Sequence, residues 1–130
     1  MRADGILIYV RDVKKAAAFY RSALGFSDGG LNTDEFTILQ LSGLRLYLHR
    51  DPNEFTGNLK GLEARKTRGD GVILHIEVAD VDAWAAGHEK AGHPISLKPT
   101  SMPFGQRQCY VYDPDGYNVA IFTPIPPSRG

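Results

Sequence analysis

The sequence is poor in the features that mark several classes of protein. Its only cysteine, Cys109, cannot form an internal disulfide, and no secretion signal follows the first residues MRADG, which together indicate a reducing cytoplasm. Lys and Arg total 15 and so do Asp and Glu, so no excess positive charge attracts nucleic acid. No apolar run is long enough to cross a membrane. We therefore expect a cytoplasmic protein that binds neither nucleic acid nor a membrane.

A strand followed by a helix is predicted in the segment GILIYVRDVKKAAAFYRSALGF. Apolar residues alternate from Ile6 to Val10, as in a strand with one buried face. Asp12 can cap the helix because its carboxylate accepts hydrogen bonds from backbone N–H groups, and Gly25 suits a left-handed stop. The apolar stripe of this helix consists of Val13, Ala16, Ala17, Phe19, Tyr20, Ala23 and Leu24.

The segment GVILHIEVADVDAWAAGHEKAGHPI repeats this pattern. Apolar residues alternate from Leu74 to Val78, Asp80 can cap the helix and Gly92 can end it. A shift of 68 residues superposes Asp12 on Asp80. The residues expected to face inward are Val81, Trp84, Ala85 and Ala91, and those expected at the surface are His88, Glu89 and His93.

Strand-like stretches follow each predicted helix, at 36–41 and 44–49, and then at 109–112 and 117–123. We therefore predict an α+β fold built from two tandem βαβββ modules. They should form a curved mixed sheet around a cavity, with the helices outside. The chain should be a single domain, 1–130, with modules at about 1–50 and 71–125.

The polar segment 51–70 is predicted to join the two modules. Its charged residues are expected to be solvated, with an anion clamp or a lid as the alternative; they include Lys60, Arg65, Lys66 and Arg68.

The stretch VYDPDGYNVAIFTP predicts a hairpin near the end of the chain. Pro114 presets the second position of a type I turn, the Asp113 side chain can bond to the backbone, and Gly116 suits the exit. Cys109, in the preceding strand, has no basic neighbour in the sequence, so we expect an inert buried thiol.

The same strand pattern predicts a binding site. If residues such as Ile8 and Ile76 lie under the helices, the alternate residues must face away and line a concavity. A lining of aromatic and apolar groups with a few polar ones is typical of a small-molecule pocket. The residues predicted to bind the ligand are Tyr9, Arg45, Tyr47, His49, His75, Glu77, Tyr110 and Phe122, beside Gln108, Tyr112, Asn118 and Ala120.

The segments VRDVKKAAAFYRSALGF, VADVDAW, PFGQR and DPDG resemble the vicinal-oxygen-chelate superfamily, which includes glyoxalase I, extradiol dioxygenases, fosfomycin-resistance enzymes and bleomycin-resistance proteins. The resemblance covers nearly the whole chain. In metal-dependent members it implies one ligand seven residues before each helix-opening Asp and a glutamate four residues after the Gly of DPDG. Those positions hold Gly5, Ile73 and Ala120, none of which can bind a cation. We therefore expect no metal and no cofactor.

The resemblance implies a metal-independent binding protein of the bleomycin-resistance type, which holds an aromatic antibiotic or a metabolite without transforming it. One alternative is a lyase or dioxygenase with its metal displaced to His49, His75 and Glu77, or an enzyme that uses His75 and Glu77 as acid and base. Another is a scaffold or stress protein with a vestigial cavity. The family and an exposed apolar sheet edge also predict a homodimer.

Overall fold

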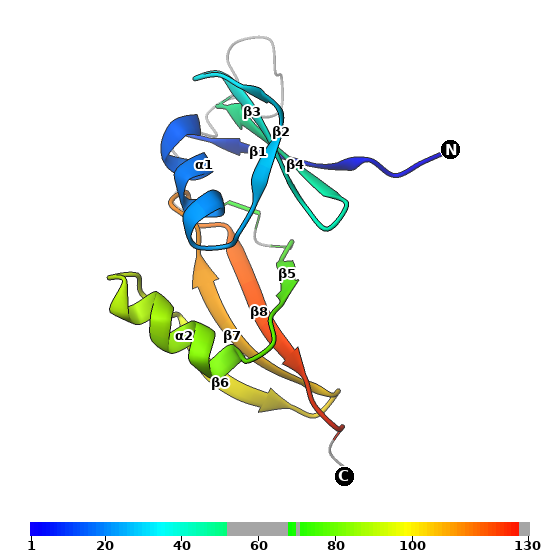
Figure 1. The fold of residues 1–130 in the computed structure, drawn as a ribbon, viewed down its shortest axis with the longest axis vertical. Helices are drawn as coiled ribbons and strands as arrows, with labels where there is room; N and C mark the ends of the chain where they lie inside the picture. Colours follow the sequence, from blue (N-terminus) through cyan, green and yellow to red (C-terminus); the bar gives the residue numbers. More distant parts are fainter. Residues whose placement is uncertain (52–67, 70, 128–130) are drawn as a thin grey trace. The chain divides into compact units, whose positions relative to one another are not determined.

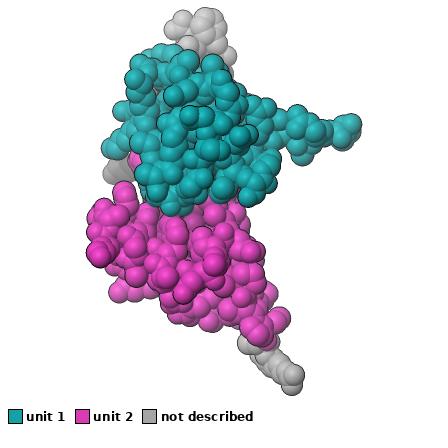
Figure 2. Space-filling model, viewed as in Figure 1, with its two compact units in different colours: residues 1–66 teal, residues 67–130 magenta. Residues whose placement is uncertain are grey.

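A computed structural model describes residues 1–51, 68–69 and 71–127 of the chain. The chain divides into two compact units, Met1–Lys66 and Thr67–Gly130, which are coloured separately in Figure 2 and are described one at a time. We call them unit 1 and unit 2. Three of the linker charges predicted to be solvated, Lys60, Arg65 and Lys66, lie outside the described residues.

Unit 1 is one βαβββ module (Figure 1). Its elements are β1 (Gly5–Val10), α1 (Val13–Ser22), β2 (Ser27–Asn32), β3 (Phe36–Leu41) and β4 (Leu44–Arg50). The strands form a four-stranded sheet in the order β1–β4–β3–β2. The sheet is mixed, because β1 runs parallel to β4 while the other neighbouring pairs are antiparallel.

Unit 2 repeats this architecture (Figure 1). Its elements are β5 (Leu74–Glu77), α2 (Val81–Lys90), β6 (Leu97–Met102), β7 (Gln106–Tyr112) and β8 (Asn118–Pro124). The strand order is β5–β8–β7–β6, and β5 runs parallel to β8. The predicted α+β fold of two βαβββ modules is therefore confirmed. Within the residues that the structure describes, however, the strands form two four-stranded sheets, whereas the sequence pattern predicted one sheet.

The two helices begin at the aspartates that the sequence indicated. Asp12 accepts a hydrogen bond from the backbone N–H of Lys15 at 3.0 Å, and Asp80 accepts one from that of Ala83 at 3.1 Å. Such bonds satisfy amide groups that have no partner within the helix. After the helices, Gly25 and Gly92 adopt left-handed φ angles of 74° and 92°.

Each helix covers one face of the sheet of its own unit. Helix α1 packs against β3 and β4, and α2 packs against β6, β7 and β8. The buried residues under the helices are Val10, Leu39, Leu46 and Leu48 in unit 1, and Ile76, Cys109, Val111, Val119 and Ile121 in unit 2. These residues alternate along their strands with others that point the opposite way. We call that opposite side the helix-free face of each unit.

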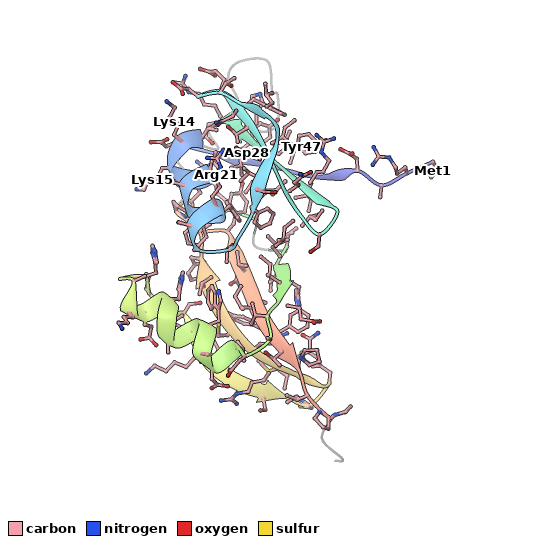
Figure 3. All side chains as sticks on the ribbon, viewed as in Figure 1. Met1, Lys14, Lys15, Arg21, Asp28 and Tyr47 are labelled. Carbon is pink, nitrogen blue, oxygen red and sulfur yellow. The ribbon has the colours of Figure 1, made fainter. Side chains whose placement is uncertain are left out.

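Strands β2 and β6 were missed by the sequence pattern. Both lie at the end of a sheet, and each pairing contains a register shift, at Asp28/Asn32 and at Leu97/Thr100. Their sequences, SDGGLN and LKPTSM, lack the alternation of a half-buried strand. Strand β2 is also held by an ion pair, because Arg21 of α1 binds Asp28 through Nη2 at 2.6 Å (Figure 3).

Two predictions about α2 were wrong. Ala91 follows the last helical residue as the C-cap and is exposed instead of facing inward. His88, expected at the surface, is buried with 6% of its surface exposed. The 68-residue shift explains this burial, because it superposes His88 on Tyr20, which is buried in α1. Trp84 is half-buried.

The prediction that the linker charges are solvated is wrong for Arg68, at the start of unit 2. Arg68 is 3% exposed, and its Nη1 lies 3.9 Å from Oδ1 of Asp115, which is also buried. A buried guanidinium needs such an acidic partner because taking an unpaired charge out of water is costly. Arg68 therefore stabilises the turn that contains Asp115 and is not solvated.

Candidate functional site

The helix-free face of unit 1 carries three rows of side chains, set by strand pairing. Gly5, Leu7 and Tyr9 of β1 lie beside Arg45, Tyr47 and His49 of β4, respectively. On the other side of β4, Arg45, Tyr47 and His49 pair with Gln40, Ile38 and Phe36 of β3, respectively. The structure therefore places four predicted ligand-binding residues on one surface: Tyr9, Arg45, Tyr47 and His49.

An aromatic cluster forms at one end of this face. The His49 ring makes edge contacts with Tyr9 and Phe36, with centroids 5.6 and 5.3 Å apart, and Phe36 also lies 5.9 Å from Tyr47. A cluster of aromatic rings of this kind can contribute stacking contacts to a planar ligand. Phe36 had not been predicted as a site residue, although its position two residues before Ile38 on a predicted strand puts it on this face.

Tyr47, in the middle row of the face, is fixed by Asp4. The Tyr47 hydroxyl donates a hydrogen bond to the Asp4 carboxylate, and Tyr47 is labelled in Figure 3. This bond lowers the pKa of Asp4 and raises that of Tyr47, because it stabilises the charged carboxylate and the neutral phenol. Tyr47 therefore stays protonated at neutral pH.

Arg45 is held at the same place by two further contacts. Its Nη2 donates to the backbone oxygen of Gly29 at 3.2 Å, and its guanidinium carbon lies 5.5 Å from the centre of the Tyr47 ring. Nη1 lies 3.6 Å from the Asp4 carboxylate. Asp4, just outside the predicted strand, gave no periodic signal, so sequence reasoning missed its role in orienting Arg45 and Tyr47.

The helix-free face of unit 2 has a similar arrangement of rows. His75 of β5 pairs with Ala120 of β8, which pairs with Tyr110 of β7. In the next row, Glu77 pairs with Phe122, which pairs with Gln108. The structure thus places the other four predicted ligand-binding residues on one surface: His75, Glu77, Tyr110 and Phe122.

His75 and Glu77 project from the same side of β5, as their spacing predicted. Both residues are exposed, and the His75 ring lies 5.8 Å from that of Phe122. Residues two apart on a strand are separated by about 6.6 Å. His49, which the displaced-metal alternative adds to this pair, belongs to unit 1.

Two amide side chains on this face, those of Gln108 and Asn118, each have a buried oxygen atom. Gln108 is 1% exposed and donates from Nε2 to Oε1 of Gln106 at 2.7 Å. Its own Oε1 has no hydrogen-bond partner, and neither does the buried Oδ1 of Asn118. Sequence alternation placed both residues on this face but gave no sign that these oxygens are buried.

The three positions where the family resemblance implies metal ligands have distinct surroundings. A Cβ at Gly5 would collide with the backbone carbonyl oxygen of Arg45, so only glycine fits there. Ile73 is exposed and Ala120 is fully buried. Among residues 1–51, 68–69 and 71–127, no group of three or more His, Cys, Asp or Glu side chains is arranged to hold a metal ion.

Cys109 lies on the helix side of β7, away from these faces. The thiol is fully buried, and loss of solvation on burial raises its pKa from 9.0 to about 11. A thiol with such a pKa is protonated at neutral pH and is a poor nucleophile. The predicted burial of the thiol is confirmed, and its raised pKa agrees with the expected lack of reactivity.

The residues of the DPDG turn form hydrogen bonds with one another, in addition to the ion pair between Arg68 and Asp115. Oδ1 of Asp113 accepts hydrogen bonds from the backbone N–H groups of Asp115 and Tyr117 at 2.8 and 2.9 Å. The N–H of Gly116 donates to the backbone oxygen of Asp113 at 3.0 Å, and Gly116 adopts a φ of 89°. The turn predicted from Asp113, Pro114 and Gly116 is therefore present.

The chain was compared with families of known proteins. Residues 45–121, more than half of its length, match the model of the Glyoxalase/Bleomycin resistance protein/Dioxygenase superfamily. The chain belongs to this superfamily. Its members share the paired βαβββ modules found here, so the resemblance noted in the sequence is confirmed. A comparison with curated protein sequences found no match.

Several solved structures share this fold. One is a glyoxalase/bleomycin resistance protein/dioxygenase family enzyme from Burkholderia phytofirmans, with 19% identity, a TM-score of 0.76 and coverage of 94% of this chain and 98% of that one. A lactoylglutathione lyase from Agrobacterium tumefaciens has 18% identity, a TM-score of 0.68 and coverage of 94% and 92%. A virulence protein from Salmonella typhimurium has 23% identity, a TM-score of 0.73 and coverage of 96% and 98%. At these identities the likeness concerns the fold alone.

None of the helices in the described part of the chain is long and apolar enough to span a membrane.

Proposed function

We propose that this superfamily member is a metal-independent binding protein for a small planar molecule, such as an aromatic antibiotic or a metabolite, which it holds without transforming it. The observation that carries the proposal is the chemistry of three positions. Gly5, Ile73 and Ala120 stand where metal-dependent members have ligands, and none of them offers a donor atom.

The surroundings of Gly5 strengthen this argument. The backbone of Arg45 occupies the space that a side chain at position 5 would need, so the pairing of β1 with β4 leaves no room for a metal-binding side chain there. The position is therefore adapted to glycine, because any larger residue would force the two paired strands apart. The absence of a three-residue cluster of metal-binding side chains in the described ranges gives the same support.

The helix-free faces supply what a planar ligand needs. Tyr9, Phe36, His49 and Tyr47 form the aromatic cluster of unit 1, and Phe122 lies beside His75 in unit 2. An aromatic contact contributes about 0.5–1.5 kcal/mol beyond the burial of apolar area. Asp4 holds Arg45 and Tyr47 in place, which reduces the entropy lost when a ligand binds.

One observation favours catalysis as a second candidate. His75 and Glu77 are both exposed on the same side of β5, where they can exchange protons with a bound molecule. An acid–base enzyme acting without a metal therefore stays the alternative to simple binding.

We also propose a homodimer in the cytoplasm. Strand β1 lies at the edge of its sheet and exposes Ile6 and Leu7, the latter with 43% of its surface accessible. Apolar side chains on a sheet edge favour association with a second copy. Light scattering during size-exclusion chromatography should give twice the monomer mass of 14.3 kDa. A monomer at micromolar concentration would contradict this part of the proposal.

The binding function can be tested by thermal unfolding with metal-free bleomycin and a panel of planar aromatic compounds, each with and without EDTA. At least one compound should raise the Tm, because a ligand that binds only the native state stabilises it, and EDTA should leave the shift unchanged. Binding that disappears with EDTA, or conversion of a bound compound, would contradict a metal-independent binding protein.

A further inference from the structure

The imidazole of His49 is held in one tautomer by the backbone of its own strand. Its Nδ1 lies 2.6 Å from the carbonyl oxygen of Arg50. A carbonyl oxygen can only accept a hydrogen bond, so Nδ1 carries the hydrogen. In the neutral imidazole the other nitrogen, Nε2, then has a free lone pair and is an acceptor.

This acceptor is not used by the part of the protein that the structure describes. The bond to Arg50 is the only hydrogen bond of the His49 side chain among the described residues. The side chain is half-buried, so part of it stays accessible to a ligand. His49 therefore offers an oriented acceptor on the helix-free face of unit 1.

The surroundings of this acceptor are aromatic. Tyr9 of β1 and Phe36 of β3 flank His49 in the same row of the sheet, and their rings contact the imidazole. Tyr47 stands in the next row, and strand residues two apart are separated by about 6.6 Å. A flat ligand of two fused rings can therefore contact both rows while its edge meets Nε2.

The charges near this end of the face are paired within the protein. Arg50 and Glu35 form an ion pair at 2.7 Å, and Nη1 of Arg45 lies 3.6 Å from the Asp4 carboxylate. An ionic ligand placed among the aromatic rings would lose its solvation without gaining a free partner of opposite charge. The surroundings therefore favour a neutral ligand.

We propose that unit 1 binds a neutral planar ring with a hydrogen-bond donor at its edge, such as the ring N–H of a fused heterocycle, and that Nε2 of His49 accepts this hydrogen bond. The inference rests on the proposed binding function and narrows the ligand to one chemical class. His49 determines specificity, because a ring that offers only an acceptor at this edge places its lone pair against that of Nε2.

Indole and benzofuran test the proposal, because they have nearly the same shape and differ in one edge group, an N–H donor in indole and an ether oxygen in benzofuran. NMR titration at about pH 8, where an ordinary imidazole is neutral, should shift the backbone amide signals of β1, β3 and β4. Indole should bind about fivefold more tightly than benzofuran, as expected for one hydrogen bond between neutral groups. Equal affinities, or a preference for benzofuran, would overturn the proposal.

The substitution His49→Phe separates the hydrogen bond from the aromatic contacts. It keeps a ring beside Tyr9 and Phe36 but removes the acceptor, so indole should bind about fivefold more weakly and benzofuran as before. His93→Phe makes the same change in unit 2, outside the proposed site, and should leave the preference for indole intact. If folded His49→Phe keeps that preference, His49 is not its source and the inference is wrong.

The tautomer can be measured without any ligand. Long-range proton–nitrogen NMR spectra of the imidazoles show which nitrogen carries the hydrogen. His49 of the unliganded protein should be in the Nδ1–H form, and its Nε2 signal should move when indole is added. A His49 ring in the Nε2–H form would overturn the inference.

Failure of this inference can be distinguished from failure of the proposed function. If panel compounds raise the Tm but indole shows no preference over benzofuran, the protein binds planar molecules and the role of His49 is refuted. If neither indole, benzofuran nor any panel compound binds, the proposed function and this inference are both wrong.

Discussion

The imidazole of His88 lies flat against the indole of Trp84, with ring centroids 4.5 Å apart and planes inclined by 19°. On its other side, His88 stacks on His93 at 4.7 Å. Loss of solvation on burial lowers the pKa of His88, and the nearby His93 lowers it further. The buried ring is therefore held in its neutral form, in contact with another titratable ring.

This stack predicts that the protein loses stability in mild acid. A histidine whose pKa is lowered by folding contributes its full stability above the unfolded value of 6.5, and this contribution is lost as the pH falls through the folded value. His88→Phe keeps a stacked ring without a titratable group, so its Tm should fall less between pH 7.5 and pH 5. Identical Tm profiles for the two proteins would show that His88 does not carry this pH dependence.

A second prediction concerns metal content. Because Gly5, Ile73 and Ala120 supply no ligand atoms, the purified protein should contain no stoichiometric zinc, iron, manganese or nickel by mass spectrometry. A metal that bound the native protein would add about 2.7 kcal/mol to the free energy of unfolding when present at 100 times its Kd. Because we expect no metal to bind, added divalent metal should leave the Tm nearly unchanged. A bound metal that is lost in His49→Ala or His75→Ala would support the displaced-metal enzyme.

A third prediction assigns the DPDG turn to stability. Gly116 adopts a left-handed φ of 89°, so Gly116→Val should lower the free energy of unfolding by about 1–3 kcal/mol. Ligand affinity of the folded variant should be unchanged, because the turn residues bond to one another. Gly71→Val is the matched control, since a Cβ there meets open space. A stable Gly116→Val protein that no longer binds ligand would place the turn in the site.

The fourth prediction separates binding from catalysis. His75→Ala and Glu77→Gln should each weaken the binding of a polar ligand by about 1–3 kcal/mol, the cost of leaving a buried partner unmatched. The variants should fold, because the helix side of β5, with Leu74 and Ile76, is untouched. If the pair is catalytic, turnover should disappear while affinity stays nearly normal. Affinity and turnover are therefore measured on the same variants.

Much of the fold followed from local signals. The caps at Asp12 and Asp80 and the turn at Gly116 depend on residues that are close together in the sequence. Alternation also assigned each strand residue to a helix side or a helix-free side. Strands β2 and β6 were missed because the register of each pairing shifts and neither strand has a fully buried residue, so their sequences do not alternate regularly.

The features that were missed depend on contacts between distant segments. Buried Arg68 pairs with Asp115, and Asp4 accepts a hydrogen bond from Tyr47, which is 43 residues away. A periodic sequence pattern does not reveal such pairs. His88 was an intermediate case, because the internal repeat that superposes it on buried Tyr20 was visible in the sequence.

The close approach of Gly5 to Arg45 also limits which substitutions position 5 can accept. A substitution that introduced histidine at position 5 would first have to separate two hydrogen-bonded strands, so it would damage folding before it conferred any metal affinity. A side-chain metal ligand therefore cannot be introduced at position 5 by a single substitution unless the backbone around it also moves.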